Sequence, residues 1–134
     1  MPEATFSTPL IALDAVVLDT ETTGLDTRKA RLVQIGAVRL KRGNLDAAQR
    51  FESLINPGCR IPKASVAVHG ITDAMVADAP KFAAIAEPFE AFVHNSIVIG
   101  HAIAYDLAVL QRNTGWPAGH GRKCGGWMCG CWRG

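Results

Sequence analysis

The sequence predicts an α/β domain with a mixed sheet, and three observations support this. Residues 15–55 contain three consecutive strand-like segments separated by short turns, which indicates an antiparallel meander. The chain then changes to helical periodicity, and a short apolar segment and a further helical segment follow. Strands followed by a helical crossover to another strand are typical of a sheet with antiparallel and parallel pairs, flanked by helices.

The strands of the meander are predicted from their alternation and from the turn residues that end them. The first covers residues 15–21 and stops before Gly24. The second covers residues 32–40, and an Arg-Gly-Asn sequence then turns the chain back. The third covers residues 49–55, where polar and apolar residues alternate, and an Asn-Pro-Gly sequence ends it.

Two helices are predicted in the middle of the chain. Thr72 is a suitable N-cap for a short helix through Val76, and Pro80 suits the first turn of a longer helix. Pro88 lies inside the longer helix and is expected to kink or divide it. The apolar residues of this helix recur at three- and four-residue steps and should form one buried stripe: Phe82, Ile85, Phe89 and Phe92.

A fourth strand and a last helix complete the predicted fold. Residues 97–99 are wholly apolar, as in a strand that is covered on both faces. A further helix is expected after Gly100 and His101, and it should end near residues 113–115.

Length and composition limit the classes of function. The chain has 134 residues, which suits one domain, and its 49% apolar and 19% charged residues indicate a globular fold. The net charge of +2 is too small to indicate nucleic-acid binding by itself. No apolar run approaches the roughly 20 residues of a membrane span, and the N-terminus has no export pattern. A cytoplasmic location without membrane contact is therefore expected.

Two acids at the end of the first strand form the first candidate site. One residue separates Asp19 from Glu21, so a strand places both on the same face and Thr20 on the other. Like charges at that spacing repel, and a hard divalent cation with oxygen ligands would relieve the repulsion. An isolated Asp-x-Glu is more often a solvated strand end, so this assignment depends on the rest of the chain.

The last segment, residues 116–134, differs in composition from the rest. It holds all three tryptophans and three of the four cysteines, among many glycines. One interpretation is a zinc site of these cysteines with His120, although their spacing is not the paired Cys-x-x-Cys of structural sites. The favoured interpretation is an aberrant, frameshifted tail. The predicted organisation is therefore a loose lead-in at residues 1–10, a partial domain at residues 11–115 and the aberrant tail at residues 116–134.

Four motifs stand in an order and spacing that resemble one enzyme family. They are residues 19–25 (Asp-Thr-Glu-Thr-Thr-Gly-Leu), 34–38 (Gln-Ile-Gly-Ala-Val), 68–72 (Val-His-Gly-Ile-Thr) and 100–107 (Gly-His-Ala-Ile-Ala-Tyr-Asp-Leu). Together they resemble the DEDDh 3′-to-5′ exonucleases, in particular the group that contains the proofreading epsilon subunit of bacterial DNA polymerase III. The resemblance covers roughly residues 15–115.

This resemblance implies a ribonuclease-H-like fold and hydrolysis of the 3′-terminal phosphodiester of single-stranded nucleic acid. Two divalent cations, Mg or Mn, would take part, and oxygen ligands favour those ions over zinc. In the family scheme Asp19 bridges both ions, Glu21 holds one of them and Asp106 holds the other. Taken alone, Asp106 would be explained as an acid that suits the N-terminal end of a helix.

The resemblance also assigns residues to the substrate. Thr22 and Gly24 match positions where the main chain and a hydroxyl approach the terminal 3′-hydroxyl. Leu25 matches a residue that packs against the last base. An apolar side chain in that place contacts every base equally well and does not select one. His69 matches a family position as well, and a histidine at a helix start or in the core is an equal alternative.

The chain departs from the family pattern in three places. Ala102 stands where the family usually has Asn, and Tyr105 where it usually has Phe. The third motif, a helix with a His and a fourth acid five residues later, is absent, because His120 is followed five positions later by Gly125 and no Asp or Glu follows Asp106. The domain is therefore interpreted as truncated before its third motif and incomplete at its C-terminus, with little or no activity.

Two alternatives remain for the function. One is a remnant that binds a metal or a nucleic-acid end without catalysis, and the other is a zinc-binding interaction module built from the cysteine-rich tail. The expected partners are a single-stranded 3′ end and a DNA polymerase subunit. The sequence does not distinguish DNA from RNA, or proofreading from repair or RNA processing.

Overall fold

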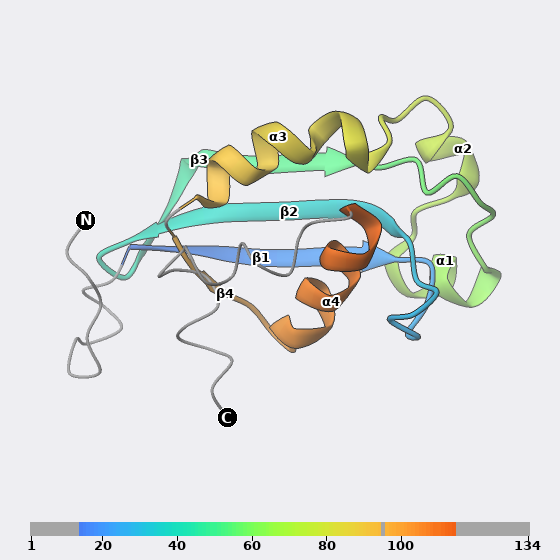
Figure 1. The fold of residues 1–134 in the computed structure, drawn as a ribbon, viewed down its shortest axis with the longest axis horizontal. Coiled ribbons are helices and arrows are strands. Elements are labelled where there is room, and N and C mark those ends of the chain that lie inside the picture. Colours follow the sequence, from blue (N-terminus) through green and yellow to red (C-terminus); the bar gives the residue numbers. More distant parts are fainter. Residues whose placement is uncertain (1–13, 95, 115–134) are drawn as a thin grey trace.

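The computed structural model describes residues 14–94 and 96–114, which form a four-stranded sheet with helices (Figure 1). In chain order the elements are β1 (Ala15–Thr22), β2 (Leu32–Lys41), β3 (Asn44–Leu54), α1 (Lys63–His69), α2 (Asp73–Val76), α3 (Phe82–Val93), β4 (Ile97–Ile99) and α4 (Ile103–Thr114). The strand order is β3-β2-β1-β4. β2 is antiparallel to both of its neighbours, and β4 is parallel to β1. The predicted mixed sheet is therefore confirmed.

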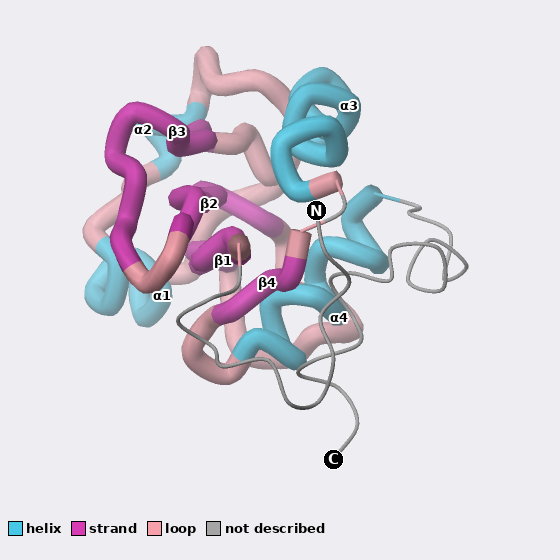
Figure 2. The backbone as a smooth tube through the Cα atoms, turned by 90° about the vertical axis from the view of Figure 1, so that its left-hand side faces the viewer, coloured by secondary structure: helices cyan, strands magenta, loops and turns pink. Residues whose placement is uncertain are grey.

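Alternation along β1 gives the sheet a core face and a second face. Val16 and Leu18 are buried, and so is Ala37, the β2 neighbour of Leu18. Helices α3 and α4 lie over this core face, as the end-on view in Figure 2 shows. Asp19 is exposed and Glu21 is half-buried, because alternate residues of a strand point to the second face.

Helix α3 covers the core face through aromatic contacts. The ring of Phe89 is fully buried and lies 5.5 Å from the ring of Phe51 in β3 and 6.1 Å from that of Phe82. Of the two outcomes predicted for Pro88, a kink or a division, division is wrong, because α3 is one helix with Pro88 inside it. A proline removes one backbone hydrogen bond, and burial of apolar side chains on both sides of it compensates for that loss. The helix also starts later than Pro80 suggested, with Lys81 as its N-cap.

A glycine allows β4 and α4 to come close to β1. A Cβ atom at Gly100 would lie 2.5 Å from the carbonyl oxygen of Leu18 and 2.9 Å from the Ile103 side chain. No other residue type fits between these atoms without movement of the backbone. Gly100 therefore lets α4 begin directly beside the middle of β1.

Helices α1 and α2 pack beside the sheet through a smaller apolar cluster. Thr72 caps α2 as predicted, and its side chain accepts a hydrogen bond from the amide of Met75 at 3.4 Å. Helix α1 begins after Pro62 and ends at Gly70, whose φ of 74° places it in the left-handed region. The buried members of the cluster are Val33, Ile61, Ile71 and Val76.

Two further differences from the predicted elements have local causes. β3 begins at Asn44 rather than near residue 49, because a two-residue turn lets it pair with β2 from Lys41 onward. Helix α1 has no predicted counterpart, since it buries none of its residues and so carries no apolar stripe. The predicted lead-in and tail lie outside the described residues, and no described helix has the length and apolarity to cross a bilayer.

Candidate active site

The end of β1 brings an acid from α4 next to the two acids of the strand. Asp106, in the first turn of α4, is only 3% exposed. Its Oδ1 accepts hydrogen bonds from the amide of Thr20 at 3.0 Å and from the Thr20 hydroxyl at 2.5 Å. Thr20 lies between Asp19 and Glu21, and β4 pairs with β1 only as far as Val17. Asp106 therefore occupies the strand edge that β4 leaves open.

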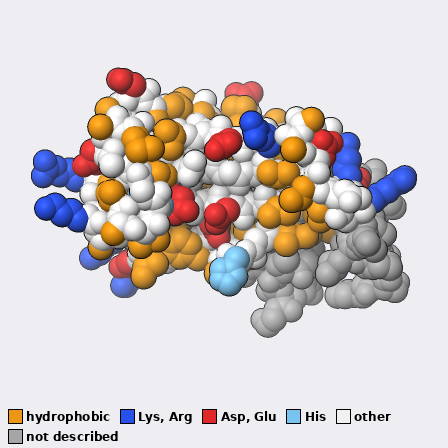
Figure 3. Space-filling view, turned by 180° about the vertical axis from the view of Figure 1, so that it is seen from behind, with side chains coloured by type: hydrophobic (Ala, Val, Ile, Leu, Met, Phe, Trp, Pro, Cys, Tyr) orange, Lys and Arg blue, Asp and Glu red, His pale blue; other side chains and the backbone are white. Residues whose placement is uncertain are grey.

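The three acids interact electrostatically. Burial raises the pKa of Glu21, and the charges of Asp19 and Asp106 raise it further, while His69 opposes the shift. Burial also raises the pKa of Asp106, against the hydrogen bonds from Thr20 that lower it, and the charge of Asp19 adds to the increase. Both directions are those of carboxylates that share a site without a counter-ion. Figure 3, a view of the second face, shows acidic side chains gathered near its middle.

The three carboxylates have the chemistry of ligands for a hard cation. Their side chains do not lie close enough together in the structure to form a ligand cluster. Three carboxylates supply only oxygen donors, the type that Mg²⁺ and Mn²⁺ prefer. Within residues 14–94 and 96–114, however, no three His, Cys, Asp or Glu side chains lie together as a metal-holding group. The Asp106 oxygen that bonds to Thr20 points to the strand rather than to the other two acids.

The last residue of β1 and the loop after it include three residues that the motif assigns to the substrate. Thr22 donates a hydrogen bond from its hydroxyl to the carbonyl of Gly24 at 2.8 Å. The next side chain, Leu25, is 92% exposed, which is unusual for a large apolar residue. The loop therefore presents a polar group and an apolar group side by side, next to Glu21.

His69 supports this loop through the backbone. Its Nδ1 accepts a hydrogen bond from the amide of Ile71 at 3.0 Å, so its Nε2 carries the proton and donates to the carbonyl of Thr22 at 3.1 Å. Both ring nitrogens thus have backbone partners within the domain. The histidine ends α1 rather than starting a helix, and it positions the end of β1.

Several contacts to the loop come from residues that motif comparison does not single out for a function. The hydroxyl of Tyr105, one position before Asp106, bonds to the carbonyl of Gly24 and lies 2.6 Å from the Thr22 hydroxyl. Ser65 in α1 donates to the carbonyl of Thr23 at 2.8 Å. For Tyr105, the sequence indicated a possible role through a hydroxyl at a position where the family usually has phenylalanine. For Ser65, nothing in the sequence indicated a contact with this loop.

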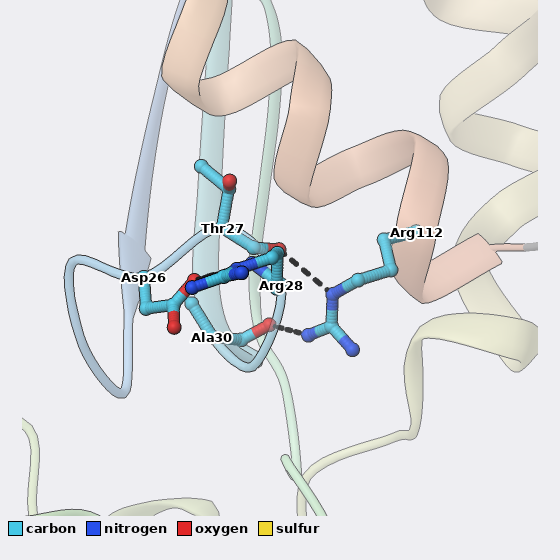
Figure 4. A network of polar contacts seen from close by, with 5 residues as sticks. All are labelled: Asp26, Thr27, Arg28, Ala30 and Arg112. Carbon is cyan, nitrogen blue, oxygen red and sulfur yellow. Dashed lines mark hydrogen bonds and ion pairs between the residues drawn. The ribbon is translucent and has the colours of Figure 1, made fainter.

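The C-terminal part of α4 holds the far end of the same loop (Figure 4). Arg112 donates from Nε to the carbonyl of Thr27 at 2.9 Å and from its guanidinium to that of Ala30. Within the loop, Asp26 accepts from the backbone and side chain of Arg28, and these hydrogen bonds lower the pKa of Asp26. One helix thus supplies the third acid and holds both ends of the β1–β2 connection.

Comparison with known proteins identifies the family. The family model described as "Exonuclease" (RNase_T) matches residues 16–115. The chain belongs to this exonuclease family. Members of the family generally use divalent metal ions. The resemblance inferred from the four motifs is therefore confirmed at the level of the family.

Two curated relatives show how the chain compares in length. A "DNA polymerase III subunit epsilon-like protein" of Rhodobacter capsulatus is 48% identical over 106 residues, which cover 78% of this chain and 15% of the relative. The "DNA polymerase III subunit epsilon" of Aquifex aeolicus is 33% identical over 99 residues, 74% of this chain and 48% of the relative. The chain thus matches less than half of the length of either relative.

Solved structures agree with the fold. Exonuclease X in complex with 5′ overhanging duplex DNA is 28% identical, with a TM-score of 0.57 over 75% of this chain and 53% of that one. Exonuclease I from Methylocaldum szegediense has a TM-score of 0.65 over 75% of this chain and 24% of that one, and at 24% identity it supports the fold alone. The ribonuclease-H-like fold class is confirmed.

Proposed function

We propose that the described residues form one part of a 3′-to-5′ exonuclease site that hydrolyses the terminal phosphodiester of single-stranded nucleic acid. The observation that carries this proposal is the hydrogen bonding of Asp106 to Thr20, between Asp19 and Glu21. It joins an acid from α4 to two acids of β1 across 86 positions of the chain. The charge of Asp19 raises the pKa of both Glu21 and Asp106, and such neighbouring carboxylates are typical of a site that a cation completes.

In this proposal Asp19, Glu21 and Asp106 hold two divalent cations, Mg or Mn. Such a pair would supply an activated water and would stabilise the departing oxygen. To act as a ligand, Asp106 would turn its carboxyl group toward Asp19 and Glu21, since its Oδ1 is bonded to Thr20. Burial at the strand edge raises the pKa of Asp106, and a nearby cation would favour its ionised form.

The loop after β1 is proposed to receive the 3′-terminal nucleotide. Leu25 is free to pack against a base, and an apolar contact of that kind does not select one base over another. Thr22 and Gly24 are proposed to contact a sugar hydroxyl, and the hydrogen bond from His69 to the Thr22 carbonyl holds this part of the chain in place. The Arg28 side chain is 87% exposed and is paired with Asp26, and it could contact a phosphate of the strand from there.

We also propose that these 134 residues by themselves hydrolyse little or nothing. No Asp or Glu follows Asp106, and the residue five positions after His120 is Gly125. The sequence thus supplies neither the histidine that would deprotonate the water nor the fourth acid. A positioned general base contributes about 10²- to 10⁴-fold, and an incomplete ligand set weakens metal binding as well.

A nuclease assay tests the last point. The purified chain is incubated with a 3′-labelled single-stranded oligonucleotide and Mn²⁺, beside the variants Asp19→Ala and Asp78→Ala, the second of which removes an exposed acid after α2. Little or no release of mononucleotide is expected from all three proteins. Rapid release by the wild type and by Asp78→Ala, with loss in Asp19→Ala, would show that the 134 residues suffice.

A search of the gene tests the family scheme itself. The neighbouring reading frame beyond Gly115 is translated and searched for a strand followed by a helix with His-x-x-x-x-Asp. A polypeptide that joins this continuation to residues 1–115 is expected to degrade the labelled oligonucleotide, and Asp106→Asn in it to abolish the activity. Lack of activity in a folded fusion with that motif would count against the exonuclease proposal.

A second candidate function is binding without cleavage, which the three retained acids favour. The chain would then take up Mn²⁺ and hold a nucleic-acid 3′ end. Isothermal calorimetry with Mn²⁺ tests this, and Asp19→Ala is expected to abolish the binding that Asp78→Ala retains. Zinc binding by the tail is a third candidate, and metal analysis of the reduced protein decides it.

The partner and the cellular role of the protein are proposed from the names of its relatives. Two of them bear the name of DNA polymerase III epsilon or an epsilon-like protein, which supports a polymerase subunit as a partner and a cytoplasmic, replication-linked role. Co-purification with a polymerase III catalytic subunit from the same organism would test the partner.

A further inference from the structure

Strand β3 is an edge of the sheet, with β2 on one side and no described strand on the other (Figure 2). It has 11 residues, and a long edge strand pairs readily with another strand unless something protects it. The register shifts between Val38 and Arg39 of β2, so residues 47–49 of β3 bulge out of the ladder. Residues 50–54 are therefore the regular part of this edge, and we call them the free edge.

Alternate residues of the free edge point their backbone groups away from β2. The amide of Ile55 donates to the carbonyl of Val33 at 2.8 Å, and this pair continues the register of Gln34 with Leu54. Hydrogen-bonded and non-hydrogen-bonded pairs alternate along an antiparallel ladder, so every second residue of β3 from Leu54 backward has no bond to β2. The N–H and C=O groups that face the open side belong to Arg50, Glu52 and Leu54.

The side chains of the free edge alternate between the two faces of the sheet. Phe51 points to the core face, where its ring lies 5.5 Å from that of Phe89. Arg50 and Glu52 therefore point to the second face, and both are exposed. Neither forms an ion pair within residues 14–94 and 96–114. The free edge thus carries two opposite, unpaired charges with one aromatic residue between them.

This pattern is complementary to itself. When two copies of the strand pair in antiparallel fashion around Phe51, Arg50 of each copy lies opposite Glu52 of the other. These two residues then form hydrogen-bonded pairs, because their backbone groups face the edge, and the two Phe51 side chains meet at the closer, non-hydrogen-bonded position. Centring the pairing on Arg50 or on Glu52 instead places like charges opposite each other, which is unfavourable.

Charged side chains can also protect an edge against pairing, and their signs distinguish the two cases. Charges of one sign repel a second copy in every register. Opposite charges on alternate residues attract in one register and repel in the neighbouring ones, as charges that fix a register do. Helix α3 packs on β3, and small residues on its exposed side leave room for the same helix of a second copy: Ala83, Ala84 and Ala91.

We propose that the free edge is the interface of a homodimer, in which residues 50–54 of two copies pair in antiparallel fashion around Phe51 and form one continuous sheet. Backbone pairing and the aromatic contact supply the affinity, and the contacts between Arg50 and Glu52 select the register. Strand β2 lies between the free edge and Asp19, so the dimer leaves the candidate site open. The inference holds whether or not the protein is a nuclease.

Analytical ultracentrifugation of the 134-residue protein over a range of concentrations tests the proposal. The wild type is expected to show a reversible equilibrium between monomer and dimer. Arg50→Glu places acids opposite Glu52 on both sides of the two-fold axis and should weaken the dimer about tenfold or more. Glu52→Arg should do the same through opposed cations. Lys29→Glu, an equal change of charge at an exposed residue between β1 and β2, should leave the dissociation constant unchanged.

A mixture of the two edge variants gives the sharpest test. Arg50→Glu and Glu52→Arg each repel themselves, but the acids of the first lie opposite the cations of the second. An equimolar mixture should therefore dimerise about as well as the wild type, and so should the double variant Arg50→Glu/Glu52→Arg. A loss caused by misfolding would not be restored by mixing, and thermal unfolding verifies that each variant is folded.

The outcomes are distinct from those of the nuclease and Mn²⁺-binding assays, which bear on the proposed function alone. A wild type that stays monomeric up to its highest soluble concentration would overturn the dimer. Dimerisation that persists equally in both single variants would place the interface elsewhere and overturn the role of the free edge. Failure of the mixture to dimerise would show that Arg50 and Glu52 do not face each other, and would overturn the proposed register.

Discussion

The end of β1 and the hairpin between β2 and β3 belong to the same sheet, yet they are stabilised in different ways. At the end of β1, side chains from α1 and α4 bond to backbone carbonyls more than 40 positions away in the chain. At the hairpin the side-chain hydrogen bonds are local, from Asn44 to the carbonyl of Arg42 and from the amide of Ala48 to Asp46. The candidate site therefore forms only when distant elements pack, whereas the hairpin is a local structure.

The largest effect is expected where α4 meets β1. Gly100→Val would push a branched side chain against the Leu18 carbonyl, which already lies 2.5 Å from the position of a Cβ. We expect a loss of about 3 kcal/mol in the free energy of unfolding, measured with urea. Gly36→Ala in β2 is the matched control, because nothing lies within 4 Å of a Cβ there. A similar loss in both variants would contradict the close approach of α4 to β1.

The second largest effect is expected from Mn²⁺, whose stabilisation of the protein should depend on the candidate site and not on the hairpin. At about 100 times its dissociation constant, Mn²⁺ is expected to stabilise the wild type by about 2.7 kcal/mol, seen as a higher midpoint of thermal unfolding. Asp106→Asn at the site should remove this increase. Asp46→Asn in the hairpin should retain it, since Asp46 bonds locally to the amide of Ala48. An unchanged increase in Asp106→Asn would exclude Asp106 as a ligand.

A smaller and stabilising effect is expected at Ala102. Its φ of 51° lies in the left-handed region, which costs an alanine about 1 kcal/mol and which asparagine tolerates better. Ala102→Asn should therefore raise the free energy of unfolding by about 0.5–1 kcal/mol. Ala104→Asn, inside α4, is the control and should lower it by about 0.5 kcal/mol through helix propensity. Destabilisation by both would show that the backbone at Ala102 carries no strain.

The smallest effect is expected in the hairpin turn. Arg42 has a φ of 48° and is followed by Gly43 at 78°, a two-residue turn in which both residues are left-handed. Arg42→Asn should stabilise the protein by about 0.5 kcal/mol, less than Ala102→Asn, and urea unfolding of the two single variants and of their combination measures both. Additive gains would show that hairpin and site are independent, and a non-additive result would show that they are coupled.

The strands and the family were predictable because their signals are local. Alternation marks β1 and β2, and the Asp-Thr-Glu-Thr-Thr-Gly-Leu sequence carries the resemblance that the family comparison confirms. Helix α1 was not predictable in this way, because it is a short helix with no buried residue. The continuity of α3 across Pro88 also depended on packing, since Phe89 is held by rings from other elements.

The candidate site was predictable in part from the sequence and depends in part on the tertiary structure. Spacing alone places Asp19 and Glu21 on one face of β1, because successive side chains of a strand alternate. The sequence pattern does not predict that Asp106 bonds to Thr20, that both ring nitrogens of His69 bond to the backbone, or that the Tyr105 hydroxyl bonds to the carbonyl of Gly24. The contacts of Asp106 and Tyr105 join α4 to β1 and its loop, and the contact of His69 with Thr22 joins α1 to the end of β1. Their geometry is a property of the folded chain, since only close packing brings atoms so far apart in sequence to within 3 Å.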